Sequence, residues 1–230
     1  MQQSGIWFFD DVNLFDFFCP HRLKEYQGKH TFKEYQKGEY IYYSQDPANK
    51  IFLVVEGKVK ISFCTPDGRE ISKMVLESGE MFGELALFGV EQRNDTAQAI
   101  SEKTVLCPLD VETMHELMRT YRTFSFKVYK TVGTRIEKME RKIESLIAKD
   151  VKTRLLEFLC EMAHERGRKA GTETLVMHSL TQKDIADLIG TSRQTVTTLL
   201  NEFKEQNLIY FDRKRILIRD LQKLSNLISA

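Results

Sequence analysis

Residues 180–196 read LTQKDIADLIGTSRQTV. Thr181 and Asp184 have the spacing of a capping box, in which a hydroxyl and a carboxylate satisfy the free N–H groups at a helix start. Apolar residues follow, and Gly190 stands where such a helix would end. Ser192 comes shortly after it and is a suitable cap for a second helix. Two helices joined by so short a glycine turn predict a helix-turn-helix.

The second helix of this motif has two chemically different faces. Its apolar residues recur at helical spacing and are expected in the core: Val196, Leu199, Leu200 and Phe203. Its other face is polar and carries Arg193, Gln194, Thr197, Thr198 and Asn201. Arginine and glutamine make bidentate hydrogen bonds with base edges in the major groove, so we predict that this face contacts DNA. The alternative is a capped helical hairpin whose outer face is merely solvated.

A predicted hairpin after the helix-turn-helix and the charge distribution along the chain both support a nucleic-acid partner. Apolar runs at residues 207–211 and 216–218 predict a β-hairpin wing. Its basic tip, which we also expect at DNA, is formed by Arg213, Lys214 and Arg215. Residues 149–230 carry 14 Lys and Arg against 11 Asp and Glu, whereas the preceding residues carry 20 against 22. This mild basic excess fits a nucleic-acid partner at the C-terminal end.

Residues 37–109 alternate short strand-like runs with glycine-containing turns, as an all-β domain does. Val59–Phe63 alternates apolar and polar side chains, as a half-buried strand does. Pro66-Asp67-Gly68 follows it and predicts a hairpin turn with a positive φ at Gly68. Regular strand and turn spacing predicts a barrel or jelly roll. We expect Val12–Tyr26, which precedes this region, to form a helix that packs on the barrel.

A long helix is expected between the two regions. Asp110 can cap a short helix that ends near Arg119, and a second helix then runs from about Arg122 to Ala148, spanning about 40 Å. Its apolar residues follow the 3, 4, 3, 4, 3 spacing of a heptad seam: Tyr129, Val132, Ile136, Met139, Ile143 and Leu146. A narrow seam amid dense charge favours pairing with the same helix of a second copy. The alternative is a helix that lies on its own core.

The chain is therefore predicted to be α+β, with three regions. Residues 1–110 form the β-rich domain, 111–148 the dimerisation helices and 149–230 the DNA-binding domain. Within the last region, Val151–Ala163 has helical periodicity, and we expect residues 167–171 to be a polar loop.

Several classes of protein are disfavoured by composition. No apolar run approaches the roughly 20 residues of a membrane span, and no secretory signal is evident. The four cysteines stand far apart without a CxxC pair, so we expect reduced thiols, a cytoplasmic location, and neither a zinc site nor an iron–sulfur cluster. Residues 37–109 contain no histidine for a metal cage and no phosphate-cradling G-x-x-x-x-G-K-[ST], so we predict no enzyme, no catalytic residues and no metal.

Three segments together carry a family resemblance. Residues 180–196, Val55-Glu56-Gly57-Lys58-Val59 and the stretch from Gly79 to Leu87 resemble the cyclic-AMP-receptor/fumarate-nitrate-regulator (CRP/FNR) family of bacterial transcription regulators. The resemblance covers nearly the whole chain from Lys37 onward. It implies a cyclic-nucleotide-binding-like β-roll (a jelly roll), a long dimerisation helix and a winged helix-turn-helix, with RNA polymerase as a further partner.

The resemblance also implies how the DNA is read. A homodimer would place one recognition helix in each of two half-sites about 34 Å apart on a near-palindrome. Arg193, Gln194 and Thr198 match the family's base-reading positions, although many relatives have glutamate and arginine at the latter two. Positions that touch phosphates in relatives correspond to Thr181, Gln182, Lys183, Ser192 and Thr195.

The effector pocket matches the family less well. Gly83-Glu84 fits the pair that meets ribose, and Arg93-Asn94 replaces the Arg-Ser pair that holds the cyclic phosphate. Leu85 and Thr96 complete this predicted site. Asp95 adds a negative charge that opposes an anion, and Met139-Glu140 stands where relatives contact adenine.

Three interpretations of this pocket stay open. Glu84 and Arg93 pair inside a vestigial pocket of an effector-independent regulator, or the pocket binds a small anionic effector, or it binds cyclic AMP, for which we expect weak affinity or none. A different class of protein, a nucleotide-binding regulatory protein that docks on another protein, is disfavoured by the helix-turn-helix. No cofactor is predicted.

Overall fold

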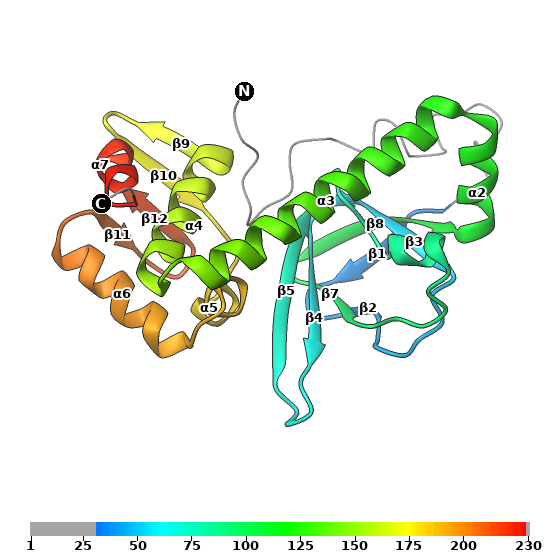
Figure 1. The fold of residues 1–230 in the computed structure, drawn as a ribbon, viewed down its shortest axis with the longest axis horizontal. Coiled ribbons are helices and arrows are strands. Elements are labelled where there is room, and N and C mark those ends of the chain that lie inside the picture. The colour runs from blue at the N-terminus through cyan, green and yellow to red at the C-terminus, as the bar shows by residue number, and fades with distance from the viewer. Residues whose placement is uncertain (1–30, 229–230) are drawn as a thin grey trace. The chain divides into compact units, whose positions relative to one another are not determined.

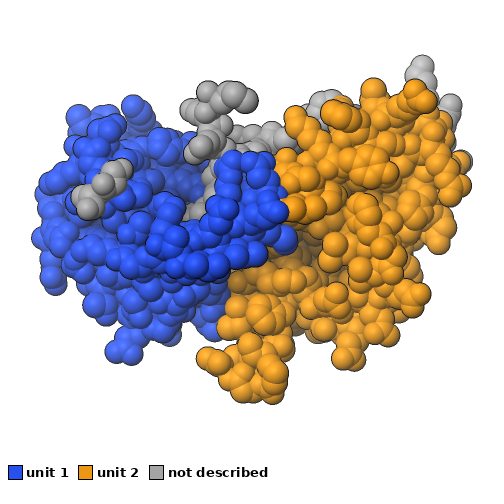
Figure 2. Space-filling view, in the orientation of Figure 1, with its two compact units in different colours: residues 1–8, 137–230 blue, residues 9–136 orange. Residues whose placement is uncertain are grey.

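The computed structural model describes residues 31–228, so the helix expected at Val12–Tyr26 lies outside the described residues. The described chain forms two compact units, one that extends to Ile136 and one that begins at Glu137 (Figure 2). One long helix, α3, contributes residues to both. Each unit is described by itself below.

The first unit is built from two four-stranded antiparallel sheets (Figure 1). One has the order β1-β8-β3-β6 and the other β2-β7-β4-β5. The strands are β1 (Lys33–Gln36), β2 (Tyr40–Tyr42), β3 (Lys50–Glu56), β4 (Lys58–Cys64), β5 (Glu70–Glu77), β6 (Met81–Phe82), β7 (Thr96–Ala99) and β8 (Lys103–Asp110). The predicted β-rich domain is confirmed. The short strands β1, β6 and β7 were not predicted.

Strand β3 is buried on both faces. Phe52 and Val54 join the core between the sheets, whereas Ile51 and Leu53 face the core beneath the helices. Because successive strand residues point to opposite faces, an unbroken apolar run is what such a strand requires. The β4–β5 hairpin turns at the predicted Pro66-Asp67-Gly68, and Gly68 has a φ of 79°.

Two helices close the first unit over the outer face of the β1-β8-β3-β6 sheet. Helix α2 (Val111–Thr120) buries Met114 and Leu117, and the start of α3 (Arg122–Ala148) adds Phe124 and Val128 to the same core. The bounds of α3 are those expected. Asp110 is the N-cap residue of α2, as predicted, but its carboxylate makes no capping hydrogen bond. It lies 3.9 Å from Lys50 Nζ instead.

The second unit packs helices against a four-stranded sheet of order β11-β12-β10-β9. Its elements are α4 (Val151–Arg166), β9 (Gly167–Ala170), β10 (Glu173–Met177), α5 (Gln182–Ile189), α6 (Arg193–Glu205), β11 (Ile209–Phe211), β12 (Arg215–Ile218) and α7 (Leu221–Asn226). The polar loop expected at residues 167–171 is wrong, because residues 167–170 form β9 and pair with β10. The segment is polar because it is an exposed edge strand, and its pairing depends on the neighbouring strand.

Within residues 31–228, no helix is both long enough and apolar enough to cross a bilayer. The same residues hold no group of three or more His, Cys, Asp or Glu side chains placed to bind a metal ion.

Candidate functional site

Helix α5 begins and ends as its sequence indicates. The Thr181 hydroxyl accepts the amide N–H of Asp184 at 3.1 Å, and the Asp184 carboxylate accepts the amide N–H of Thr181 at 2.9 Å. Gly190 closes the helix with a φ of 72°, and a Cβ there would lie 2.6 Å from Leu146 Cδ2. The positive φ therefore favours glycine at this turn, whereas the contact with Leu146 involves only the end of an exposed side chain that can move.

Helix α6 presents the predicted reading face to solvent. Ser192 caps it by accepting the amide N–H of Thr195 at 3.1 Å. Val196, Leu200 and Phe203 are buried. Arg193, Gln194, Thr198 and Asn201 are exposed. The Arg193 side chain makes no hydrogen bond or ion pair with any residue of the described chain, so its guanidinium is free for a base edge.

The residues expected at phosphates line the start of the two helices. Gln182 accepts a hydrogen bond from the Thr197 hydroxyl at 2.6 Å, which ties α5 to α6. The same hydroxyl lies 2.9 Å from the carbonyl oxygen of Arg193, so its one proton is shared between the two acceptors. The hydroxyls of Ser192 and Thr195 lie 2.8 Å apart, and Lys183 Nζ is 3.1 Å from Asp187.

The wing is a β-hairpin between β11 and β12, as predicted. Asp212 holds its turn by accepting the amide N–H groups of Lys214 and Arg215 and by pairing with the Arg215 guanidinium at 2.6 Å. These hydrogen bonds, led by that of Arg215, hold the pKa of Asp212 below its usual value. Arg215, the first residue of β12, thus pairs with Asp212, and it is exposed together with Arg213 and Lys214 at the basic tip.

Arg154 of α4 is a positioning residue that the sequence did not reveal. Its buried guanidinium donates to the carbonyls of Ile189 at 2.9 Å and Gly190 at 3.3 Å, and to that of Lys149 at 2.6 Å. One side chain thus joins the helix-turn-helix turn to the connection between α3 and α4. Only the placement of an arginine among apolar residues of α4, beside Leu155 and Leu156, hinted at it.

We expect Arg154→Met to destabilise the second unit by about 3 kcal/mol, because it leaves buried carbonyls without donors. The buried amides of α5 and α6 should then exchange with solvent about a hundredfold faster, as measured by hydrogen exchange. Arg168→Met is the matched control, since Arg168 is exposed on β9. Equal exchange rates in the two variants would show that Arg154 does not hold the turn.

The Gly83-Glu84 loop is anchored to α3. Glu84, which is 8% exposed, forms an ion pair with Arg135, and Arg135 also donates to the carbonyl of Met81 at 2.7 Å. The expected Glu84–Arg93 pair is therefore wrong. In the sequence, Arg135 is one of the many charges around the heptad seam, and helical periodicity gives no sign of its partner in a distant loop.

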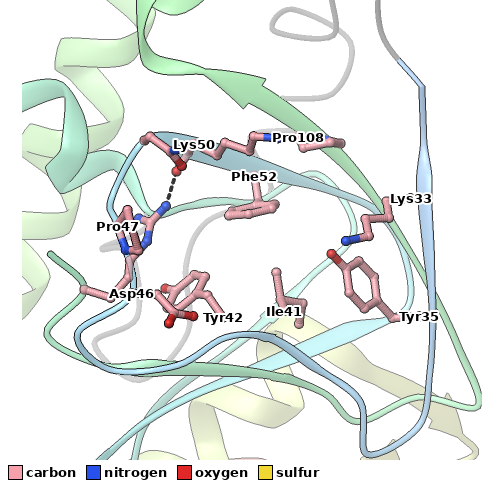
Figure 3. Close-up of a pocket in the computed structure, with 11 residues that line it drawn as sticks. Lys33, Tyr35, Ile41, Tyr42, Asp46, Pro47, Lys50, Phe52 and Pro108 are labelled. Atoms are coloured by element: carbon pink, nitrogen blue, oxygen red, sulfur yellow. Dashed lines mark hydrogen bonds between the residues drawn. The ribbon is translucent and has the colours of Figure 1, made fainter. Parts of the chain in front are cut away.

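Arg93 is turned into the β-roll, where it lines a cavity of about 260 Å³ (Figure 3). Its guanidinium donates to the carbonyl of Gly83 at 3.2 Å and to that of Lys50, and lies 4.5 Å from the ring centroid of Tyr42. Burial lowers the pKa of Arg93, although an arginine stays charged. Gly83 has a φ of 77°, and a Cβ there would lie 2.7 Å from Arg93 Nη1 and 3.1 Å from the Lys50 carbonyl oxygen, so the backbone conformation favours glycine at this position.

The other residues expected in the pocket do not converge on one point. Asn94 and Leu85 are exposed, and the Thr96 hydroxyl accepts the amide N–H of Ser44 at 3.3 Å. Asp95 was expected to repel an anion. Its carboxylate is 2.9 Å from Lys73 Nζ and accepts the Tyr42 hydroxyl at 3.1 Å, so its charge is compensated.

The heptad seam of α3 is apolar and open. Exposed fractions are 58% for Tyr129, 53% for Ile136, 47% for Met139 and 57% for Ile143. Leu146 is also exposed, and Val132 is half-buried. The opposite side of the helix is buried from Phe124 onward.

Comparisons with known proteins match both regions. A cyclic nucleotide-binding domain model matches residues 32–121, and a Crp-like helix-turn-helix domain model matches residues 153–227. A CRP-like cAMP-activated global transcriptional regulator of Mycobacterium tuberculosis is 29% identical, with 84% of this chain and 85% of that protein aligned. A global nitrogen regulator of Synechococcus elongatus is 28% identical, with 81% and 84% aligned.

Solved structures show the same architecture. A CooA mutant from Carboxydothermus hydrogenoformans has a TM-score of 0.82 at 26% identity, covering 98% of this chain and all of that one. FixK2 from Bradyrhizobium japonicum has a TM-score of 0.75 at 25% identity, covering 87% and 98%. With an effector-type β-roll, a long helix and a helix-turn-helix in this order, and relatives aligned along most of the chain, the protein belongs to the CRP/FNR family of DNA-binding transcription regulators.

Proposed function

We propose that this regulator acts as a homodimer on a near-palindromic DNA site, with α6 of each subunit in a major groove. The observation that carries this is the division of α6 into a buried face and an exposed face that presents Arg193, Gln194 and Thr198. In helix-turn-helix dimers the two half-sites lie about 34 Å apart. Phosphate contacts from Thr181, Gln182, Lys183, Ser192 and Thr195 would set the register of the protein on DNA.

The exposed heptad seam of α3 supports the dimer. Apolar side chains recur along this stripe for most of the helix, and a contiguous exposed apolar patch commonly marks a protein contact. The heptad spacing suits a second helix of the same kind. We accordingly propose three functional regions, at residues 1–110, 111–148 and 149–230, working in the cytoplasm with RNA polymerase as a further partner.

We also propose that the β-roll responds to a small anion. The ion pair of Glu84 with Arg135 connects the loop at Gly83 directly to the helix that bears the seam. A ligand that altered this pair would act on the dimer helix without an intermediate. The relative from M. tuberculosis carries the name of a cAMP-activated regulator, which makes a nucleotide the first effector to test.

Cyclic AMP itself is expected to bind weakly or not at all. A cyclic phosphate at Arg93 would have to replace hydrogen bonds that its guanidinium already makes with two carbonyls. Met139 and Glu140 offer adenine a thioether and a negative charge. Calorimetric titration of the full chain with cyclic AMP and cyclic GMP checks this, and micromolar affinity for cyclic AMP would show the expectation to be wrong.

Selection of genomic fragments on the purified protein tests the proposed function. Bound fragments should share a two-fold symmetric sequence, and footprinting should protect two half-sites one helical turn apart. Repeating the selection with candidate effectors separates an effector-dependent regulator from an effector-independent one. A protein that enriches no sequence over bulk DNA would contradict the proposal.

A further inference from the structure

The sheet of the second unit has one buried face and one open face. Helices α4 and α6 pack against its strands. The buried face is formed by Thr174, Val176, Ile216 and Ile218. On the other face, Leu217 of β12 has Leu175 of β10 on one side and Tyr210 of β11 on the other. Since cross-strand partners and every second residue share a face, we define the outer face by Leu175, Met177, Tyr210 and Leu217.

The outer face is apolar although it is open to solvent. Met177 is 51% exposed and Tyr210 is 45% exposed, whereas Leu175 and Leu217 are half-buried. An antiparallel sheet with one face in water commonly carries polar side chains on that face. A contiguous exposed apolar patch is typical of a surface that contacts another segment or molecule.

Arginines border the outer face. Arg168 of β9 and Arg215 of β12 are the register partners of residues on this face. Arg215 is paired with Asp212, and Glu173, which lies on the same face, is paired with Arg219. Arg168 is exposed and has no ion pair within the described chain. The outer face therefore suits an occupant that combines large apolar side chains with free carboxylates.

Residues 6–11 of the same chain have this chemistry. They read IWFFDD, four large apolar residues followed by two aspartates, and the first Lys or Arg of the chain is Arg22. They lie outside residues 31–228, to which residues 12–30 connect them. Even with the helix expected at Val12–Tyr26, this connection spans about 35 Å, which is more than the diameter of a small domain. It is therefore long enough for residues 6–11 to lie on a distant part of their own chain.

We propose that residues 6–11 dock on the outer face of their own chain. The aromatic side chains would cover Leu175 and Leu217, and the aspartates would pair with Arg168. Burial of apolar surface supplies the driving force, and the complementary charges fix the orientation of the segment on the sheet. Because the segment is tethered, its effective concentration at the outer face far exceeds that of the same segment on a separate molecule.

The fluorescence of Trp7 tests this docking. Trp7 is the single tryptophan of the chain, so its emission reports on this segment alone. In the folded full chain without DNA, the emission should be blue-shifted from that of the urea-unfolded protein, and acrylamide should quench it several-fold less. Both effects should persist on dilution, because docking within one chain does not depend on protein concentration.

Two results of this measurement would overturn the proposal. Emission and quenching equal to those of the unfolded protein would mean that residues 6–11 are undocked and that the outer face is left to a separate partner protein. Protection of Trp7 that is lost on dilution would mean that the segment docks on a second copy. Since DNA is absent, either result is independent of operator binding.

Variants of the outer face show where Trp7 is bound. Met177→Asp places a negative charge within the apolar patch and should shift the emission and quenching of Trp7 toward the unfolded values. Arg168→Glu should do the same, because it repels the aspartates of the segment. Leu227→Asp is the matched control, since Leu227 is an exposed leucine of the same unit that lies outside the outer face. It should leave the emission unchanged.

Arg168→Glu decides the outcome if circular dichroism shows that Met177→Asp does not fold, since Arg168 is an exposed residue of an edge strand. Trp7 fluorescence that is unchanged in every folded variant of the outer face, or that changes equally in Leu227→Asp, would show that Trp7 is buried elsewhere and that the assigned face is wrong.

Discussion

Ile136→Asp is expected to convert the proposed dimer to a monomer. Ile136 lies in the middle of the exposed seam of α3, and the substitution would place two aspartates, one from each subunit, at the helix contact. Burying an unpaired charge costs several kcal/mol, and each dimer would bury two such charges close together. Sedimentation velocity should show monomer at concentrations where the unmodified protein is a dimer.

Lys130→Asp is the matched control, because it adds an aspartate to the same helix at an exposed position outside the seam. It should sediment as the unmodified protein does. Loss of the dimer should also reduce affinity for a two-half-site operator far more than affinity for a single half-site. An Ile136→Asp protein that stays fully dimeric would contradict the inference that the heptad seam forms the dimer contact.

Arg193→Ala is expected to lower operator affinity by roughly ten- to a hundredfold per half-site and to relax preference at one base pair. Arg193 is the first residue of α6 after the Ser192 cap, and its side chain is exposed and unpaired within the described chain. A bidentate arginine–guanine contact contributes about 1–3 kcal/mol of discrimination. The loss should therefore appear on operator DNA and be small on scrambled DNA.

Lys183→Ala is the informative comparison, since Lys183 is predicted at a phosphate. It should weaken operator and scrambled DNA alike and reduce the salt dependence, because phosphate contacts carry no sequence information. The ion pair of Lys183 with Asp187 is exposed on the lysine side and contributes little to stability, so the fold should tolerate the change.

Titration of both DNAs at two salt concentrations separates the two roles. If Arg193→Ala lost affinity equally for operator and scrambled DNA, Arg193 would be a phosphate ligand, and the proposed docking of α6 would be wrong.

The helix-turn-helix was predictable to the residue because its signals are local. A four-residue capping box, a left-handed glycine and a serine cap each act through hydrogen bonds between near neighbours in the chain. The long helix and the wing were predictable for the same reason, since a helical or strand periodicity is readable within one segment.

The edge strands and the site contacts were not predictable in this way. Residues 167–170 form a strand only because β10 lies beside them. Glu84 is bound by Arg135 and not by Arg93, which is nearer in sequence, because α3 runs past the loop that holds Glu84.

The sequence by itself determined the order of the regions, the ends of the main helices and which face of α6 is polar, since these follow from caps, turns and periodicity within short segments. Only the tertiary structure decided that Arg154 holds the helix-turn-helix turn, that Asp95 is neutralised by Lys73 and that Arg93 is a buried cation beside a cavity. Those properties arise from contacts between segments far apart in the chain. The balance of burial and charge at such contacts depends on three-dimensional packing, which no local pattern encodes.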